Sequence, residues 1–168
     1  MKRSMYTALF AALLVAAAFP LAAQSASNPV ELGVSVGPTF PVGSGETIVN
    51  DGSSSFNWGF YVNIPLVYAL DLMPSAELYK FNATQATDID LAFKFIVPLG
   101  DFSVYAGFVP GLTAVSETLA PHVGALLGGS YHIVSNLSGF LQGKYNVLFD
   151  GDRNIRVIHL NAGLLLAF

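Results

Sequence analysis

The feature that most constrains the fold is a two-residue alternation of apolar and polar side chains, which recurs in eight segments. Near the C-terminus, every second residue from Ile158 to Phe168 is apolar, and His159, Asn161 and Gly163 lie between them. Successive side chains of a strand point to opposite faces, so this period indicates strands with one apolar face. The segments are residues 30–36, 56–66, 75–81, 88–99, 102–109, 122–133, 137–147 and 154–168.

The connections between these segments alternate in length. Residues 100–101 and 134–136 are short enough for tight turns, whereas residues 41–55 and 111–121 are predicted to be long loops. Such an alternation is typical of consecutive hairpins whose short turns all lie at one end. We therefore expect an all-β chain of antiparallel hairpins.

Two kinds of barrel could use this alternation. A soluble barrel of the lipocalin type turns its apolar face inward and its polar face to water. A transmembrane barrel turns the apolar face to lipid and fills a narrow interior with the polar face. Only 11% of the residues are charged, against about 25% in an ordinary soluble domain, and small residues dilute the polar face. We therefore predict a single eight-stranded antiparallel transmembrane up-and-down β-barrel.

The N-terminal residues have the parts of a secretory signal. Lys2 and Arg3 precede an apolar run that contains a proline, and the small residues that follow suit cleavage after Ser25. We expect residues 1–25 to be a cleaved signal peptide and residues 26–168 to form the barrel; an uncleaved membrane anchor is the alternative. The sequence contains no cysteine, so neither lipoprotein acylation nor a disulfide is available to it.

The last segment resembles the C-terminal assembly signal of bacterial outer-membrane barrels. Residues 26–168 as a whole are similar to the small eight-stranded members of the outer membrane protein beta-barrel domain family. The resemblance implies a bacterial outer-membrane location, both termini in the periplasm, contact with outer-membrane lipid, and recognition of the last strand by the barrel assembly machinery. We expect a monomer without a cofactor. The residues that carry the predicted assembly signal are Leu160, Ala162, Leu164, Leu166 and Phe168.

The charged residues of the polar face are expected to meet inside the barrel. An eight-stranded barrel encloses only enough space for side chains, and an unpaired charge in such an interior is costly. We therefore predict that the lumen is plugged by a structural polar cluster, and a proton or ion path is the functional alternative. The predicted members of this cluster are Glu31, Glu77, Asp90, Lys94, Lys144 and His159.

The sequence argues against several functions. The net charge is −4, and loss of Lys2 and Arg3 would make it more negative, so nucleic acid has no basic surface to bind. Outer-membrane lipid A deacylases carry an H-x-S-N stretch, but here Asn161 stands where the nucleophilic serine would be. We expect no enzyme and no metal site.

The role we favour is structural or surface-interacting, with the two long loops contacting an extracellular ligand that the sequence does not identify. A narrow gated conduit for protons or small solutes is the first alternative. A lipid-modifying outer-membrane enzyme is the second.

Overall fold

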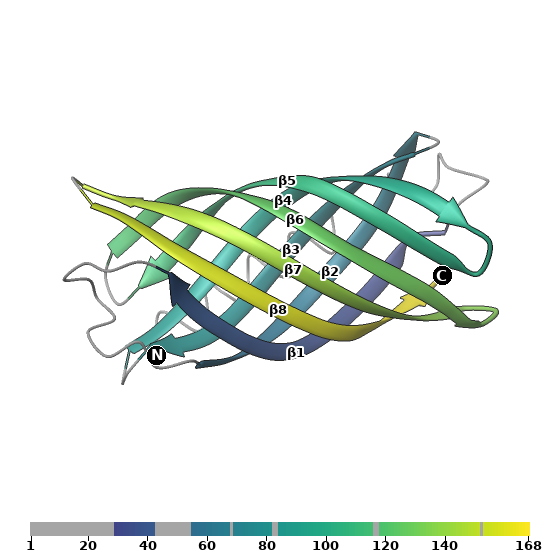
Figure 1. The fold of residues 1–168 in the computed structure, drawn as a ribbon, viewed down its shortest axis with the longest axis horizontal. Helices are drawn as coiled ribbons and strands as arrows, with labels where there is room; N and C mark the ends of the chain where they lie inside the picture. The colour runs from purple at the N-terminus through teal and green to yellow at the C-terminus, as the bar shows by residue number, and fades with distance from the viewer. Residues whose placement is uncertain (1–28, 43–54, 68, 82–83, 116–117, 152) are drawn as a thin grey trace.

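The computed structural model describes residues 29–42, 55–67, 69–81, 84–115, 118–151 and 153–168. In this part of the chain, eight strands pair antiparallel in sequence order, and the first also pairs with the last, so the sheet closes into a barrel (Figure 1). The strands are β1 (Glu31–Val42), β2 (Ser55–Val67), β3 (Leu70–Phe81), β4 (Thr84–Leu99), β5 (Phe102–Val115), β6 (Thr118–Val134), β7 (Leu137–Asp150) and β8 (Arg153–Ala167). The predicted signal peptide lies outside the described residues. The described part of the chain contains no helix long and apolar enough to cross a membrane.

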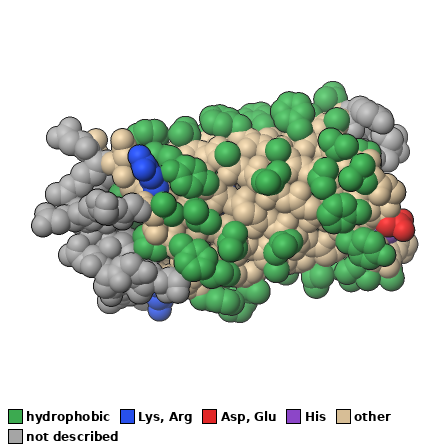
Figure 2. Space-filling view, in the orientation of Figure 1, with side chains coloured by type: hydrophobic (Ala, Val, Ile, Leu, Met, Phe, Trp, Pro, Cys, Tyr) green, Lys and Arg blue, Asp and Glu red, His purple; other side chains and the backbone are tan. Residues whose placement is uncertain are grey.

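The outer surface of the barrel is apolar, as the alternation predicts. Trp58, Phe95 and Leu127 are 58%, 62% and 69% exposed, although side chains of this size are normally buried in a soluble domain. Figure 2 shows large apolar side chains over the whole visible wall, with Lys and Arg at one end and acidic and histidine side chains at the other. The predicted assignment of faces is therefore confirmed.

The two ends of the barrel differ in their connections. Short turns join β2 to β3, β4 to β5 and β6 to β7 at one end, which we call the short-turn end. In the β4–β5 turn Gly100 has a φ of 73°, a conformation that residues with a side chain rarely adopt. The last residue is joined to the start of β1 at the same end, because the Phe168 N–H donates to the Val30 carbonyl over 3.0 Å. We call the opposite end the loop end.

The strands are longer than the sequence pattern indicates, and the prediction of a long loop over residues 111–121 is wrong. Of the supposed loop 111–121, residues 111–115 belong to β5 and residues 118–121 to β6. Pro110 and Pro121 look like turn signals, but both lie within the β5–β6 ladder, opposite Val123 and Leu112. The only local sign of Pro110 is a break in the β4–β5 pairing beside it, where proline has no N–H to donate. Of the other predicted loop, residues 43–54 lie outside the described residues.

Two apolar residues that break the alternation fill the inside of the barrel. Leu126 and Phe140 point inward and are buried, at 3% and 8% exposure. Glycines on neighbouring strands leave room for such large side chains: a Cβ at Gly163 would lie 2.6 Å from the Phe140 ring. The interior is therefore packed by large and small residues facing one another.

Candidate functional site

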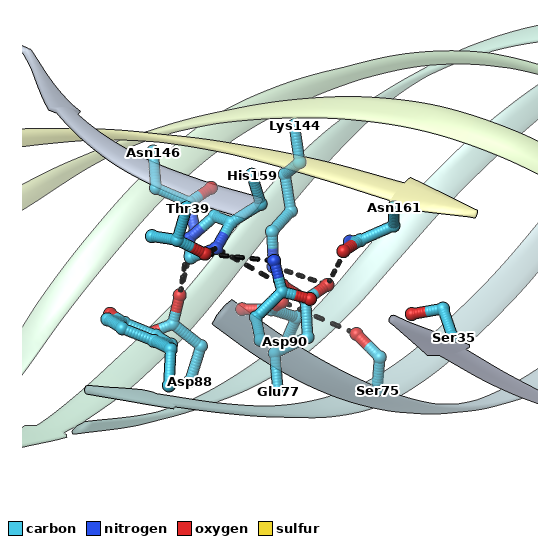
Figure 3. A network of polar contacts seen from close by, with 12 residues as sticks. Ser35, Thr39, Ser75, Glu77, Asp88, Asp90, Lys144, Asn146, His159 and Asn161 are labelled. Atoms are coloured by element: carbon cyan, nitrogen blue, oxygen red, sulfur yellow. Dashed lines mark hydrogen bonds and ion pairs between the residues drawn. The ribbon is translucent and has the colours of Figure 1, made fainter. Parts of the chain in front are cut away.

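Six ionisable side chains meet in the middle of the barrel, and we call this group the central cluster. All six are buried, and they come from five strands: β3, β4, β6, β7 and β8. Figure 3 shows most of these side chains converging from opposite walls of the barrel. The members of the central cluster are Glu77, Asp88, Asp90, His122, Lys144 and His159.

Lys144 on β7 bridges two carboxylates from the facing wall. Its Nζ lies 3.0 Å from Glu77 Oε1 and forms a second, shorter contact with Asp90 Oδ2. The Tyr61 hydroxyl donates to the same Glu77 oxygen over 2.9 Å, and the Ser75 hydroxyl donates to Asp90 Oδ2 over 3.3 Å. A buried carboxylate remains charged when a cation and several neutral donors bind its oxygens.

His159 on β8 lies between two other acidic residues. Its Nδ1 is 2.8 Å from the Thr39 hydroxyl and 3.5 Å from Glu77 Oε2, while its Nε2 is 3.3 Å from Asp88 Oδ2. The ring also packs edge-on against Tyr79, with 5.0 Å between the ring centroids. His159 thus links Glu77 and Asp88.

Asp88, Asp90 and His122 form the second half of the cluster, together with Thr113. Asp88 Oδ1 accepts hydrogen bonds from the Tyr79 and Thr113 hydroxyls, both over 2.8 Å. His122 Nδ1 is 2.8 Å from Thr113 Oγ1, and His122 Nε2 is 2.7 Å from Asp90 Oδ1. One ligand-type atom from each of Asp88, Asp90 and His122 lies within 4.8 Å of the other two.

The contact between His122 and Asp90 depends on a glycine. Gly111 on β5 pairs with both Asp90 and His122 in the ladders on its two sides. A Cβ at Gly111 would lie 2.4 Å from His122 Nε2 and 2.7 Å from Asp90 Oδ1. Any larger residue at this position would push the two side chains apart.

The structure does not bring all six predicted residues together. Glu77, Asp90, Lys144 and His159 lie in the central cluster, but Glu31 and Lys94 lie nearer the short-turn end. There the Asn63 amide donates to Glu31 Oε2 over 2.9 Å and to Asp71 Oδ2 over 2.8 Å.

Lys94 belongs to this second polar group. It pairs with Asp71 in the β3–β4 ladder, and its Nζ lies 4.6 Å from the centre of the Tyr105 ring. The polar face of the sequence therefore makes two groups at different depths.

Sequence reasoning missed two members of the central cluster. Asp88 was read only as the first residue of its segment, although it lies two residues before Asp90 and therefore on the same face. His122 is the first residue of the segment 122–133, and its proximity to β4 depends on the register of two ladders, which the alternation does not specify.

Apolar side chains lie on both sides of the central cluster. Along β4, inward positions run from Lys94 through Ala92 to Asp90 and Asp88, and then to Ala86. The group on the short-turn side consists of Tyr61, Met73, Ala92, Tyr105, Val109, Leu126, Phe140 and Leu165. The group on the loop side consists of Tyr79, Ala86, Leu148, Ile155 and Val157.

The arrangement of the strands is similar to that of solved bacterial outer-membrane proteins. The structure of Neisserial surface protein A (NspA) aligns with a TM-score of 0.72 and 15% identity, over 83% of this chain and 97% of that one. The fold is that of the small outer-membrane barrels. The outer membrane protein OprG from Pseudomonas aeruginosa aligns with a TM-score of 0.56 and 10% identity, over 84% of this chain and 97% of that one. No protein-family model and no curated protein matches the sequence.

Proposed function

We propose that the protein is a bacterial outer-membrane barrel with a structural or surface-interaction role. The observation that carries this proposal is the apolar wall, which surrounds an interior that holds the six buried ionisable side chains of the central cluster. In water such a wall would be a large aggregation-prone surface, whereas in a bilayer it replaces contacts between lipid chains. Closure of β1 on β8 leaves no unpaired sheet edge, which lipid would not tolerate.

We further propose that the lumen is closed to solutes. Two features support this: the central cluster is packed between apolar groups, and its charged members contact one another or neutral donors. An ion that crossed the barrel would have to displace both apolar groups and break the pairs between them. A narrow path for protons or small solutes is the competing function.

The proposal includes an orientation in the membrane and a set of partners. We place both termini in the periplasm and the loop end outside, with outer-membrane lipid around the wall and one barrel per functional unit. The last strand would be the element read by the barrel assembly machinery. The apolar residues at this end of the chain support the assignment, because their side chains face outward. The exposed ones include Leu164 and Leu166 in β8 and Phe168 after it.

The proposal is tested first by the state of the protein in membranes. Barrels of this class should resist SDS until boiled, so the extracted protein is expected to run at two positions, unboiled and boiled. Protease added to whole cells should cut residues 43–54 and leave the rest intact. A soluble periplasmic protein with no mobility shift would contradict the membrane assignment.

Conductance separates the closed barrel from the conduit. The purified, folded protein, inserted into a planar bilayer, is expected to give no single-channel steps above the lipid baseline. Regular steps that depend on the amount of protein would contradict the closed lumen while leaving the membrane assignment intact. A mass shift of lipid A between wild-type and deletion strains would instead support the lipid-modifying enzyme.

A further inference from the structure

The hydrogen bonds around His122 fix which atoms can carry protons. Thr113 has one hydroxyl proton, and it is donated to Asp88 Oδ1. In the contact between Thr113 Oγ1 and His122 Nδ1, the ring N–H must therefore be the donor and the hydroxyl oxygen the acceptor. A neutral His122 ring protonated at Nδ1 has a lone pair at Nε2.

That lone pair faces another acceptor. His122 Nε2 lies 2.7 Å from Asp90 Oδ1, and a carboxylate oxygen also has no proton to give. Two acceptors at this distance repel each other unless they share a cation. The shared cation is either a proton or a metal ion.

The charges of the central cluster point to the same need for a cation. Among its described members, Glu77, Asp88 and Asp90 carry three carboxylates, and Lys144 supplies one ammonium. With both imidazoles neutral, the cluster has an excess of two negative charges in a buried interior, which is costly. One divalent cation removes this excess.

Contrary to our expectation from the sequence, we propose that Asp88, Asp90 and His122 bind a divalent transition-metal ion inside the barrel. The three side chains present one ligand atom each within 4.8 Å of the others, and all three are buried. One imidazole with two carboxylates is a donor set that suits Zn²⁺ and its neighbours in the first transition row. Binding would release the shared proton to solvent, and His122 Nε2 and Asp90 Oδ1 would then both serve as ligand atoms.

The surroundings fit a metal site better than a simple ion pair. A metal-ligating histidine usually donates its other N–H to an oxygen that fixes the ring, and here Thr113 takes that role while also orienting Asp88. Asn146 donates to Asp88 Oδ2 over 3.1 Å, and its own Oδ1 is buried with no hydrogen-bond partner among the described residues. His159 Nε2, 3.3 Å from Asp88 Oδ2, is likewise buried without one.

Zinc content after refolding tests the proposal. The purified protein is unfolded with chelator, refolded in detergent with excess Zn²⁺, freed of loose metal by gel filtration, and analysed by mass spectrometry for zinc per folded barrel. We expect about one zinc per wild-type barrel and at least a tenfold loss in His122→Asn. The matched control is His132→Asn, which changes an exposed histidine at the short-turn end and should keep the full equivalent.

Two results would overturn the site. One is a folded wild-type barrel that holds no zinc, in which case a proton is the shared cation. The other is a His122→Asn barrel that holds as much zinc as the wild type. Should His122→Asn not fold, the wild type refolded with Co²⁺ decides by X-ray absorption: a histidine nitrogen among the ligands supports the site, and oxygen ligands alone contradict it.

Discussion

Lys144 is the residue on which the charge pairing of the interior depends most. It contacts Glu77 and Asp90 at once, on two neighbouring strands of the opposite wall. Taking two carboxylates and an ammonium out of water costs several kcal/mol per ion, and only their close contacts offset this cost. The residue therefore affects stability through the charges it would leave behind.

Removal of that ammonium should destabilise the barrel strongly. Lys144→Met leaves two buried carboxylates without their partner, and we expect a loss of about 3–5 kcal/mol of unfolding free energy. The measurement is urea unfolding of the barrel in lipid vesicles. The double variant Lys144→Met with Glu77→Gln removes one of the stranded charges, so it should be more stable than the single variant. Additive losses from the two substitutions would contradict the pairing.

An arginine on the outer wall tests the lipid contact at a single position. Leu91 lies near the middle of β4 and faces outward, so Leu91→Arg should cost about 2–4 kcal/mol in a bilayer. The matched control, Leu99→Arg, places the same charge on the same face at the end of β4, where about 0–1 kcal/mol is expected. Equal costs at both positions in vesicle unfolding experiments would argue against a bilayer around the wall.

At the scale of the strand, β8 both closes the barrel and presents its apolar face to the outside. It pairs with β7 from Arg153 to Leu166, and with β1 residues 31–36 and 39–42. Phe168 follows the strand and is 72% exposed, so its side chain adds little to the packing. We therefore predict that the Phe168 side chain acts in recognition during assembly and contributes little to stability.

Deletion of Phe168 should therefore separate assembly from stability. We expect the variant to refold in detergent with unchanged unfolding free energy, because little packing is lost. In cells, its amount in the outer membrane should fall several-fold, measured by the heat-shifted band. Phe56→Ala, which removes another exposed phenyl ring, is the control and should keep its level. A matching loss in both variants would remove the special role of the terminus.

The elements also show what could be read from the sequence and what could not. The period-two pattern predicts the strands and their outward faces, because lipid imposes one demand on every outward position. Leu126 and Phe140 break the pattern because the interior must be filled, and filling depends on the glycines opposite. The long loop expected after Pro110 is a hairpin, since a strand can continue through a proline where one pairing is interrupted.

The membership of the central cluster was harder to predict for a related reason. Lumen-facing residues follow from the alternation, but their neighbours across the barrel follow from the stagger of eight ladders. Lys144 therefore meets Asp90, which lies 54 positions away in the chain, while Glu31 and Lys94 lie in a different group.

At the scale of the whole molecule, the two apolar groups inside the barrel are expected to keep it closed. The variant Leu126→Ala with Phe140→Ala truncates one leucine and the phenylalanine of the group on the short-turn side. We expect it to show brief conductance steps in a planar bilayer where the wild type shows none. The control is Leu127→Ala with Leu141→Ala, which truncates the adjacent outward residues and should remain silent. Equal currents in both variants would contradict closure by these side chains.

The height of the wall has a consequence for what a partner would meet. About 9–11 tilted residues cross a bilayer, but β5 has 14 and β6 has 17. The surplus makes β5 and β6 continue as a paired ribbon almost to their connection. A ligand that docks on this ribbon finds it already ordered and loses little affinity to immobilising it. The same pairing limits which substitutions the ribbon tolerates, because each residue there also belongs to the β5–β6 ladder.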